Sequence, residues 1–82
     1  SDLNRIVKVA TGMTAHAYIG RKLTDEARRE LVFTETPAQG IGLRLGFADP
    51  AYFSRYFLRE TGETPRAFRL AERARLAAQS SE

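Results

Sequence analysis

Two arginines four residues apart, Arg55 and Arg59, are the residues best suited to chemistry in this sequence. In a helix, that spacing places both guanidinium groups on one face, next to the hydroxyl of Ser54. A guanidinium presents a planar fork of donors that fits phosphate oxygens and the edge of guanine. The pattern therefore favours contact with a nucleic acid, and the competing interpretation is an ordinary solvated face.

Other kinds of chemistry find little support in the residue types. His16 is the only histidine and the chain has no Cys, so we expect no metal site and no disulfide. Asp25 and Glu26 are adjacent and point about 100° apart on a helix, which does not make a catalytic carboxylate pair. The sequence has no nucleophile–base set and no Gly-rich phosphate loop. It predicts neither an enzyme nor a cofactor.

The composition fits one small domain. Its 82 residues are 43% hydrophobic, enough for a modest core, and the formal net charge is +3. All but two of the 13 basic residues are Arg. No stretch approaches the roughly 18 consecutive apolar residues of a membrane span, and the absence of Cys suits a reducing compartment. We expect a cytoplasmic protein with no membrane partner.

Proline positions predict where helices begin. Each of the three prolines follows a residue that can cap a helix, in the pairs Thr36-Pro37, Asp49-Pro50 and Thr64-Pro65. Proline is tolerated in the first turn because its missing N–H would have had no partner there. Gln39 follows Thr36 by three residues, which is a capping-box arrangement. Helices should therefore begin near residues 37, 50 and 65.

Glycine positions predict where helices end. Gly12, Gly46 and Gly62 each follow an apolar-periodic stretch, as a left-handed residue after a helix does. The predicted helices are 3–11, 37–45, 50–61 and 65–78, with one long helix over about 14–34 that Thr14 can cap. A break in the long helix between Gly20 and Thr24 is the alternative. No alternating pattern predicts a strand.

The short connection between the helices 37–45 and 50–61 predicts a helix-turn-helix. A four-residue link that begins with Gly46 forces the two helices to cross steeply, and Gly42 would let the second helix approach closely. On the second helix, Phe53 and Phe57 share one face with Tyr56 beside them, and we expect this group in the core. The opposite half carries Ala51, Ser54, Arg55, Leu58 and Arg59, a set that fits a DNA major groove.

The run from Gly46 to Phe57, followed by Gly62, Thr64-Pro65 and Phe68-Arg69, resembles the signature of AraC/XylS transcription regulators. That signature is approximately G-F-x-[DS]-x-S-Y-F-x-R-x-F-K, then G-x-[TS]-P-x-x-[YF]-R. Weaker likeness extends the resemblance to about residues 3–69. Two departures concern proposed contacts, because Leu58 replaces a usual Lys and Ala51 a usual Ser.

The resemblance implies an all-α protein with two homeodomain-like helix-turn-helix units joined by a long linker helix. Residues 1–12 would hold the recognition helix of a truncated first unit, residues 13–35 the linker helix, and residues 36–78 the second unit with its C-terminal helix. Each recognition helix would enter one of two successive major grooves of double-stranded DNA. The resemblance also implies an effector-binding domain elsewhere in a longer chain, and RNA polymerase as a further candidate partner.

The expected DNA contacts come from both units. The resemblance assigns to the first unit Asn4, Arg5 and Lys8, with Ser1 as a further candidate, and to the second unit Pro50, Ala51, Ser54 and Arg55. Reasoning from the residues adds Asp49, whose helix end can approach a phosphate, and Arg59, which would lie near the groove wall.

Three interpretations stay open. The module could instead dock a partner subunit or RNA polymerase, and salt dependence of binding to duplex DNA would discriminate the two. The arginines of the last helix could touch phosphates or form a solvated face with Glu72 as a partner; they are Arg66, Arg69, Arg73 and Arg75. The segments 11–14 and 61–64 share the pattern Thr-Gly-x-Thr, which would fit one supersecondary unit used twice.

Overall fold

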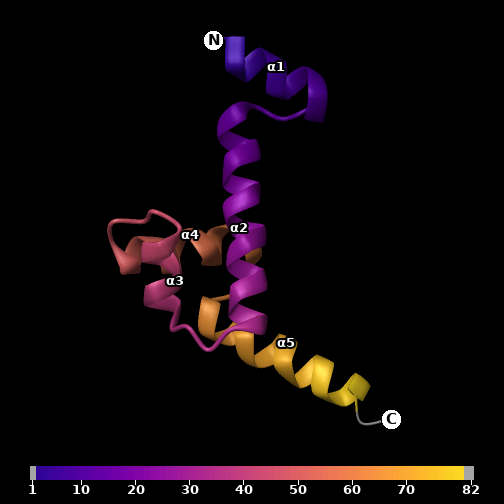
Figure 1. The fold of residues 1–82 in the computed structure, drawn as a ribbon, viewed down its shortest axis with the longest axis vertical. Helices are drawn as coiled ribbons and strands as arrows, with labels where there is room; N and C mark the ends of the chain where they lie inside the picture. The colour runs from indigo at the N-terminus through magenta and orange to yellow at the C-terminus, as the bar shows by residue number, and fades with distance from the viewer. Residues whose placement is uncertain (1, 81–82) are drawn as a thin grey trace.

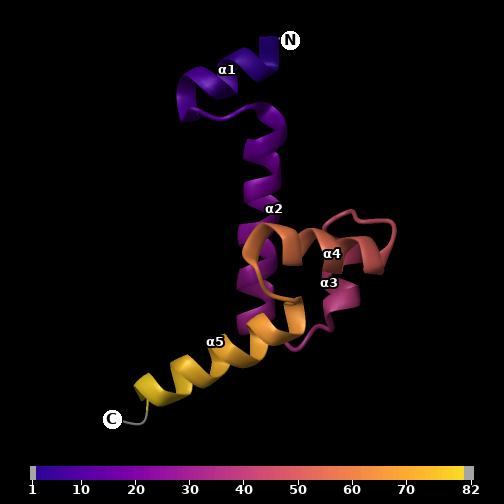
Figure 2. The ribbon, with the colours of Figure 1, turned by 180° about the vertical axis from the view of Figure 1, so that it is seen from behind.

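The computed structural model describes residues 2–80, with the side chains of 2, 4, 7, 9 and 11 outside that description. Within these residues it contains five helices and no strand: α1 (Asp2–Thr11), α2 (Ala15–Phe33), α3 (Ala38–Arg44), α4 (Pro50–Thr61) and α5 (Pro65–Ser80). Figures 1 and 2 show α2 as the central rod, with α1 across one end and α3, α4 and α5 gathered around its other half. The predicted all-α fold is confirmed.

Side-chain caps start three of the helices as predicted. The Thr14 hydroxyl accepts a hydrogen bond from the Ala17 amide at 3.1 Å, and the Thr64 hydroxyl accepts one from the Ala67 amide at 3.1 Å. The Asp49 carboxylate accepts one from the Ala51 amide at 3.0 Å. Each bond satisfies a first-turn amide that has no partner inside its own helix.

The predicted capping box at Thr36 is wrong. Helix α3 begins at Ala38, and its N-cap is Pro37, which makes no side-chain capping bond. Thr36 is held differently, because its carbonyl accepts a hydrogen bond from Arg69 at 2.6 Å and its amide donates to the Thr34 hydroxyl at 3.2 Å. A contact from a distant helix therefore overrides the local capping pattern.

The glycines end helices as predicted. Gly12, Gly46 and Gly62 have φ of 76°, 100° and 84°, in the left-handed region that favours glycine. The Gly12 amide donates to the Lys8 carbonyl at 2.7 Å, and the Gly62 amide donates to the Leu58 carbonyl at 2.8 Å. Since a threonine-capped helix follows each of these two turns, the repeated Thr-Gly-x-Thr pattern marks the same local structure twice.

Helix α2 is continuous, so the predicted alternative of a break near Gly20 is wrong. The hydroxyl of Thr24 donates to the Gly20 carbonyl at 2.9 Å, within the helix. No helix in the described part of the chain is long and apolar enough to cross a membrane.

The core lies where α2, α3 and α4 meet. Its fully buried apolar residues are Ala27, Leu31, Ile41, Phe53 and Phe57. The prediction that Phe53 and Phe57 form the core is confirmed, whereas Tyr56 is only half-buried. A Cβ on Gly42 would lie 2.8 Å from Phe53 Cβ, so the glycine does permit the close approach of α4. This contact seats α4 directly on α3.

Two arginines of α5, Arg69 and Arg73, close the carboxyl end of α2, and we call them the arginine clasp. Arg69 donates to the carbonyls of Leu31 (2.7 Å), Thr34 (3.1 Å) and Thr36 (2.6 Å). Arg73 donates to the carbonyls of Val32 (3.3 Å) and Thr34 (2.7 Å). The predicted alternative of a solvated face is therefore wrong for these two half-buried residues, whereas contact with phosphates stays a prediction. The solvated pair is found further along, where Arg75 lies 2.7 Å from Glu72.

Candidate nucleic-acid interface

The outward face of α4 carries the residues predicted to read DNA in the second unit. Ala51, Arg55, Leu58 and Arg59 are exposed, and Ser54 is half-buried at the edge of this face. Phe53 and Phe57 hold the opposite face against the core. The helix therefore presents one solvent-facing surface, and none of these residues belongs to the buried core.

The amino end of α4 is already occupied by a negative charge. Asp49 uses its carboxylate to cap the helix, and the half-buried Pro50 takes the first helical position. A carboxylate at that place neutralises the partial positive charge that would otherwise attract a phosphate. Asp49 therefore fits the role of fixing where α4 starts better than that of a direct phosphate contact.

The two arginines of this face differ in their surroundings. The guanidinium of Arg59 lies over the ring of Tyr56, 5.3 Å from its centroid, and Arg59 Nε lies 3.6 Å from Glu60 Oε2. Among the described residues, no ion pair engages Arg55. Arg59 is thus held in place by a ring, whereas the donors of Arg55 stay available to a ligand.

An aromatic cluster supports the turn and the start of α4. The ring of Phe47 lies 5.8 Å from that of Tyr52, 5.2 Å from that of Phe53 and 5.4 Å from that of Tyr56. Tyr52 is 48% exposed and joins the outward face. Tyr52 was not among the predicted contacts, although the i, i+3, i+7 spacing of Tyr52, Arg55 and Arg59 on one helix was the available signal.

An ion pair between the buried Glu30 of α2 and the exposed Arg44 of α3 links these two helices. Glu30 is 3% exposed, and its carboxylate accepts hydrogen bonds from both donor arms of Arg44, one of them at 3.0 Å from Nε. Arg44 also lies 3.7 Å from Glu26. The hydrogen bond from Arg44 holds the pKa of Glu30 below its ordinary value of 4.5, against the opposing effect of burial. This pair, which positions the first helix of the helix-turn-helix, was not predicted from the sequence.

The predicted residues of the first unit lie on α1. Arg5 and Lys8 are exposed there, whereas Ser1 and the side chain of Asn4 fall outside the described residues. Figures 1 and 2 show α1 beyond one end of α2, with α4 beside the other half of that helix. The structure therefore does not bring the two predicted groups into one patch, and α2 separates them.

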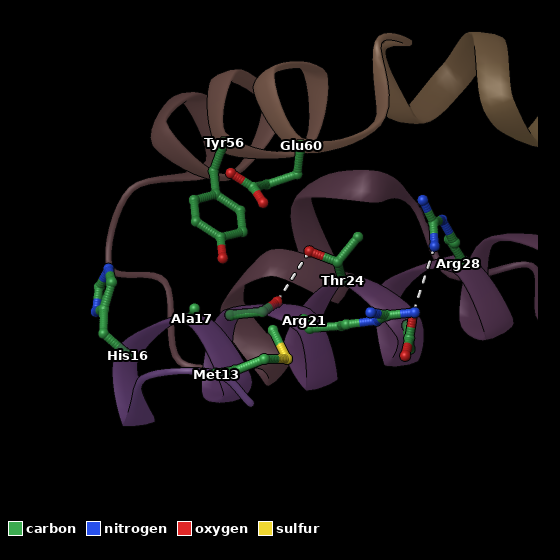
Figure 3. Close-up of a pocket in the computed structure, with 10 residues that line it drawn as sticks. Met13, His16, Ala17, Arg21, Thr24, Arg28, Tyr56 and Glu60 are labelled. Atoms are coloured by element: carbon green, nitrogen blue, oxygen red, sulfur yellow. Dashed lines mark hydrogen bonds and ion pairs between the residues drawn. The ribbon is translucent and has the colours of Figure 1, made fainter. Parts of the chain in front are cut away.

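A groove of about 410 Å³ runs between α4 and the half of α2 nearest to α1 (Figure 3). Tyr56 and Glu60 project into it from α4, and His16, Arg21 and Thr24 line its floor on α2. Its charges are mixed and partly paired, since Arg28 lies 3.3 Å from Asp25. In the described residues, no cluster of three or more His, Cys, Asp or Glu side chains could hold a metal ion.

Comparison with known proteins gives concordant matches. A family model described as a helix-turn-helix domain matches residues 1–71. The HTH-type transcriptional activators RhaS of Yersinia pestis (strain Pestoides F) and of Yersinia pseudotuberculosis (strain YPIII) are each 36% identical over 67 residues, which are 82% of this chain and 24% of theirs. The chain thus spans about a quarter of the length of these curated relatives.

One solved structure is similar in both fold and sequence. It is the DNA-binding domain of AdpA, a global transcriptional factor, in complex with a target DNA. The TM-score is 0.79 at 28% identity, and the match covers 88% of this chain and 65% of that one.

Proposed function

The chain belongs to the AraC-type helix-turn-helix family, and from this premise we propose that it binds double-stranded DNA sequence-specifically, as the DNA-binding part of a bacterial transcription regulator in the cytoplasm. Helices α1 and α4 would enter two successive major grooves. The 19 residues of α2 span about 28 Å at the usual helical rise, close to the roughly 34 Å of one turn of B-DNA. A rigid helix of that length suits two readers on one face of a duplex.

The observation that carries the proposal is the outward face of α4. It is exposed, it has at its centre an arginine that no ion pair engages among the residues that the structure describes, and it lies opposite the core residues that hold the helix. The likeness to a domain solved with DNA supports the same assignment. In this arrangement Arg55 reads a base edge, Arg59 contacts the phosphates of the groove wall, and the small residue Ala51 lets the backbone come close.

Alanine substitutions at the two arginines test these roles. We expect Arg55→Ala to cost about 1–3 kcal/mol of binding free energy on a preferred duplex and to flatten discrimination at one base pair. Arg59→Ala should weaken binding to all duplexes about equally and lower the salt slope by about one unit. Duplexes enriched from a random pool by the full-length protein, and their scrambled counterparts, are titrated at several salt concentrations.

Arg75→Ala is the matched control, because it removes the same charge from an exposed pair on α5. Equal losses for Arg55→Ala on enriched and scrambled duplexes would make Arg55 a phosphate contact instead of a base contact. If neither Arg55→Ala nor Arg59→Ala changes binding, the outward face of α4 is not the DNA-reading surface.

A second candidate function is a docking module for a partner subunit or RNA polymerase. One observation favours it, an apolar hollow of about 380 Å³ beside the turn, where Leu23, Leu45, Phe47 and Tyr52 meet. Binding through this hollow would depend little on salt, whereas binding to DNA falls steeply as salt rises. The salt series above therefore separates the two functions.

A further inference from the structure

Gly20 of α2 lies opposite Tyr56 of α4. A Cβ built on Gly20 would come within 3.0 Å of the Tyr56 hydroxyl oxygen, closer than Cβ atoms approach other atoms in proteins. The next atom of that ring, Tyr56 Cζ, would lie 3.7 Å away, which is ordinary van der Waals contact. Figure 3 shows the Tyr56 hydroxyl directed from α4 towards α2. The hydroxyl oxygen, and not the ring carbon that bears it, is therefore the atom that a Cβ at position 20 would approach too closely.

Glycine is a poor residue for the middle of a helix, since it loses more conformational freedom on folding than alanine does. Gly20 lies inside the unbroken helix α2 and has no positive φ that would explain it. The close approach of the Tyr56 hydroxyl is the contact that a side chain at position 20 would disturb.

The ring of Tyr56 borders the groove and is flanked by two aromatic rings and a guanidinium. Its centroid lies 5.4 Å from that of Phe47 and 6.5 Å from that of Tyr52. The guanidinium of Arg59 covers it at 5.3 Å. A side chain placed on Gly20 would therefore push either this cluster, with Arg59 on it, or the whole of α4.

The contact between Tyr56 and Gly20 can affect the tilt of α4 because it lies away from the core along α2. Ala27 and Leu31 are the residues of α2 that share the core with Phe53 and Phe57 of α4, whereas Gly20 is seven residues nearer to α1 than Ala27, a distance of about 10 Å along the helix. Two supports that far apart determine the tilt of α4 relative to α2. Tyr56 and Gly20 supply the support on the side of α1.

We propose that Tyr56 and Gly20 form a positioning pair that sets the tilt of α4 on α2, and so the geometry by which α1 and α4 engage two DNA segments at once. This inference rests on the proposed function. Neither residue needs to touch DNA, because the pair acts through the placement of the outward face of α4. Its effect should therefore appear in the affinity for DNA that α1 and α4 bind together, and not in the binding of DNA by either helix alone.

The experiment compares two duplexes built from sequences that the full-length parent protein enriches from a random pool. The two-site duplex carries both enriched motifs, and the one-site duplex has one motif scrambled. The ratio of the two affinities measures how well one rigid protein engages both segments. Thermal melting of every variant monitors folding separately.

We expect Gly20→Ala to lower affinity for the two-site duplex about tenfold and to leave the one-site affinity within about twofold of the parent. Tyr56→Phe removes the hydroxyl that would collide, so Gly20→Ala combined with Tyr56→Phe should restore the two-site affinity. The double variant should also melt above Tyr56→Phe alone, because alanine favours a helix over glycine. Tyr18→Phe is the matched control, since Tyr18 lies on α2 under Lys22 and its loss of a hydroxyl should rescue nothing.

Three results would overturn the inference and leave the proposed function intact: Gly20→Ala binding both duplexes as the parent does, a parallel loss on both duplexes, or a failure of Tyr56→Phe to rescue. A parent protein that enriches no sequence at all would refute the proposed function, and this inference with it. If Gly20→Ala unfolds, the rescued double variant and Tyr56→Phe still decide the question, because rescue by removal of one oxygen is the outcome that the collision requires.

Discussion

Replacing Arg69 with alanine removes three of the five hydrogen bonds that the arginine clasp donates to backbone carbonyls. The substitution tests whether a distant side chain, instead of a local cap, stabilises the end of α2. Helix α2 has no glycine after its last turn, and its C-cap residue Thr34 has an extended backbone. The carbonyls of its last turn therefore need other donors. Arg69 and Arg73 supply them across more than 30 residues of sequence.

The size of the effect follows from the bonds that are lost. Arg69 bonds three carbonyls, but that of Thr34 keeps a donor in Arg73 at 2.7 Å. The carbonyls of Leu31 and Thr36 lose theirs. A bond from a charged donor contributes about 1.5–3 kcal/mol net, and water partly replaces it at this half-buried site. We expect Arg69→Ala to lower the free energy of unfolding by about 2–4 kcal/mol.

Urea denaturation followed by circular dichroism measures this change. Arg69→Lys keeps the charge but not the fork of donors, so it should recover less than half of the loss. Arg75→Ala is the control, because that arginine forms only an exposed pair with Glu72 and should cost under about 0.5 kcal/mol. An Arg69→Ala loss no larger than the Arg75→Ala loss would refute the idea that the clasp holds the end of α2.

Three further expectations concern the core, the pH and α1. Phe57→Ala should lower the free energy of unfolding by about 3–5 kcal/mol, whereas Arg55→Ala should lower it by under about 0.5 kcal/mol. If thermal denaturation reversed this order, Phe57 would not face the core and Arg55 would not face the solvent. The pKa of Glu30 is lowered in the fold, so its stabilising effect is present above pH 4.5 and is lost as the pH falls through the folded pKa; the melting temperature of the parent should drop more steeply in that range than that of Glu30→Gln. Leu3 and Ile6 of α1 are exposed at 60% and 62%, and a lone helix of this length is marginal in water, so amide exchange over 6–10 in a dilute chain of these 82 residues should show little protection.

The parts of the fold that sequence predicted well depend on contacts within a few residues. The caps at Asp49 and Thr64 and the left-handed Gly46 and Gly62 act over two to four positions, so residue type and spacing were enough. The two faces of α4 also followed from helical periodicity alone. Once five helices and a short turn are placed, few arrangements remain that bury two phenylalanines on the same side.

The parts that sequence did not predict depend on residues far apart in the chain. Thr36 has a good capping pattern, but Arg69 takes up its carbonyl, and the helix begins two residues later without a side-chain cap. Arg69 and Arg73 looked like members of a basic face because most of their partners are backbone carbonyls, which carry no sequence signal, and the one carboxylate, Glu35, lies 38 residues before Arg73. The pairing of Glu30 with Arg44 needed the crossing of α2 and α3 to be known first.

The division of labour on α4 also has an evolutionary consequence. Ala51 and Arg55 contribute nothing to the core, so new side chains at these positions can arise without loss of the folded state. A lineage of such proteins can therefore drift from one preferred sequence to another through neutral steps. Tyr56 is the exception, since it carries Arg59 and bears on Gly20, and a change there has to be matched on α2. We expect positions 20 and 56 to change together among descendants, while positions 51 and 55 diversify independently.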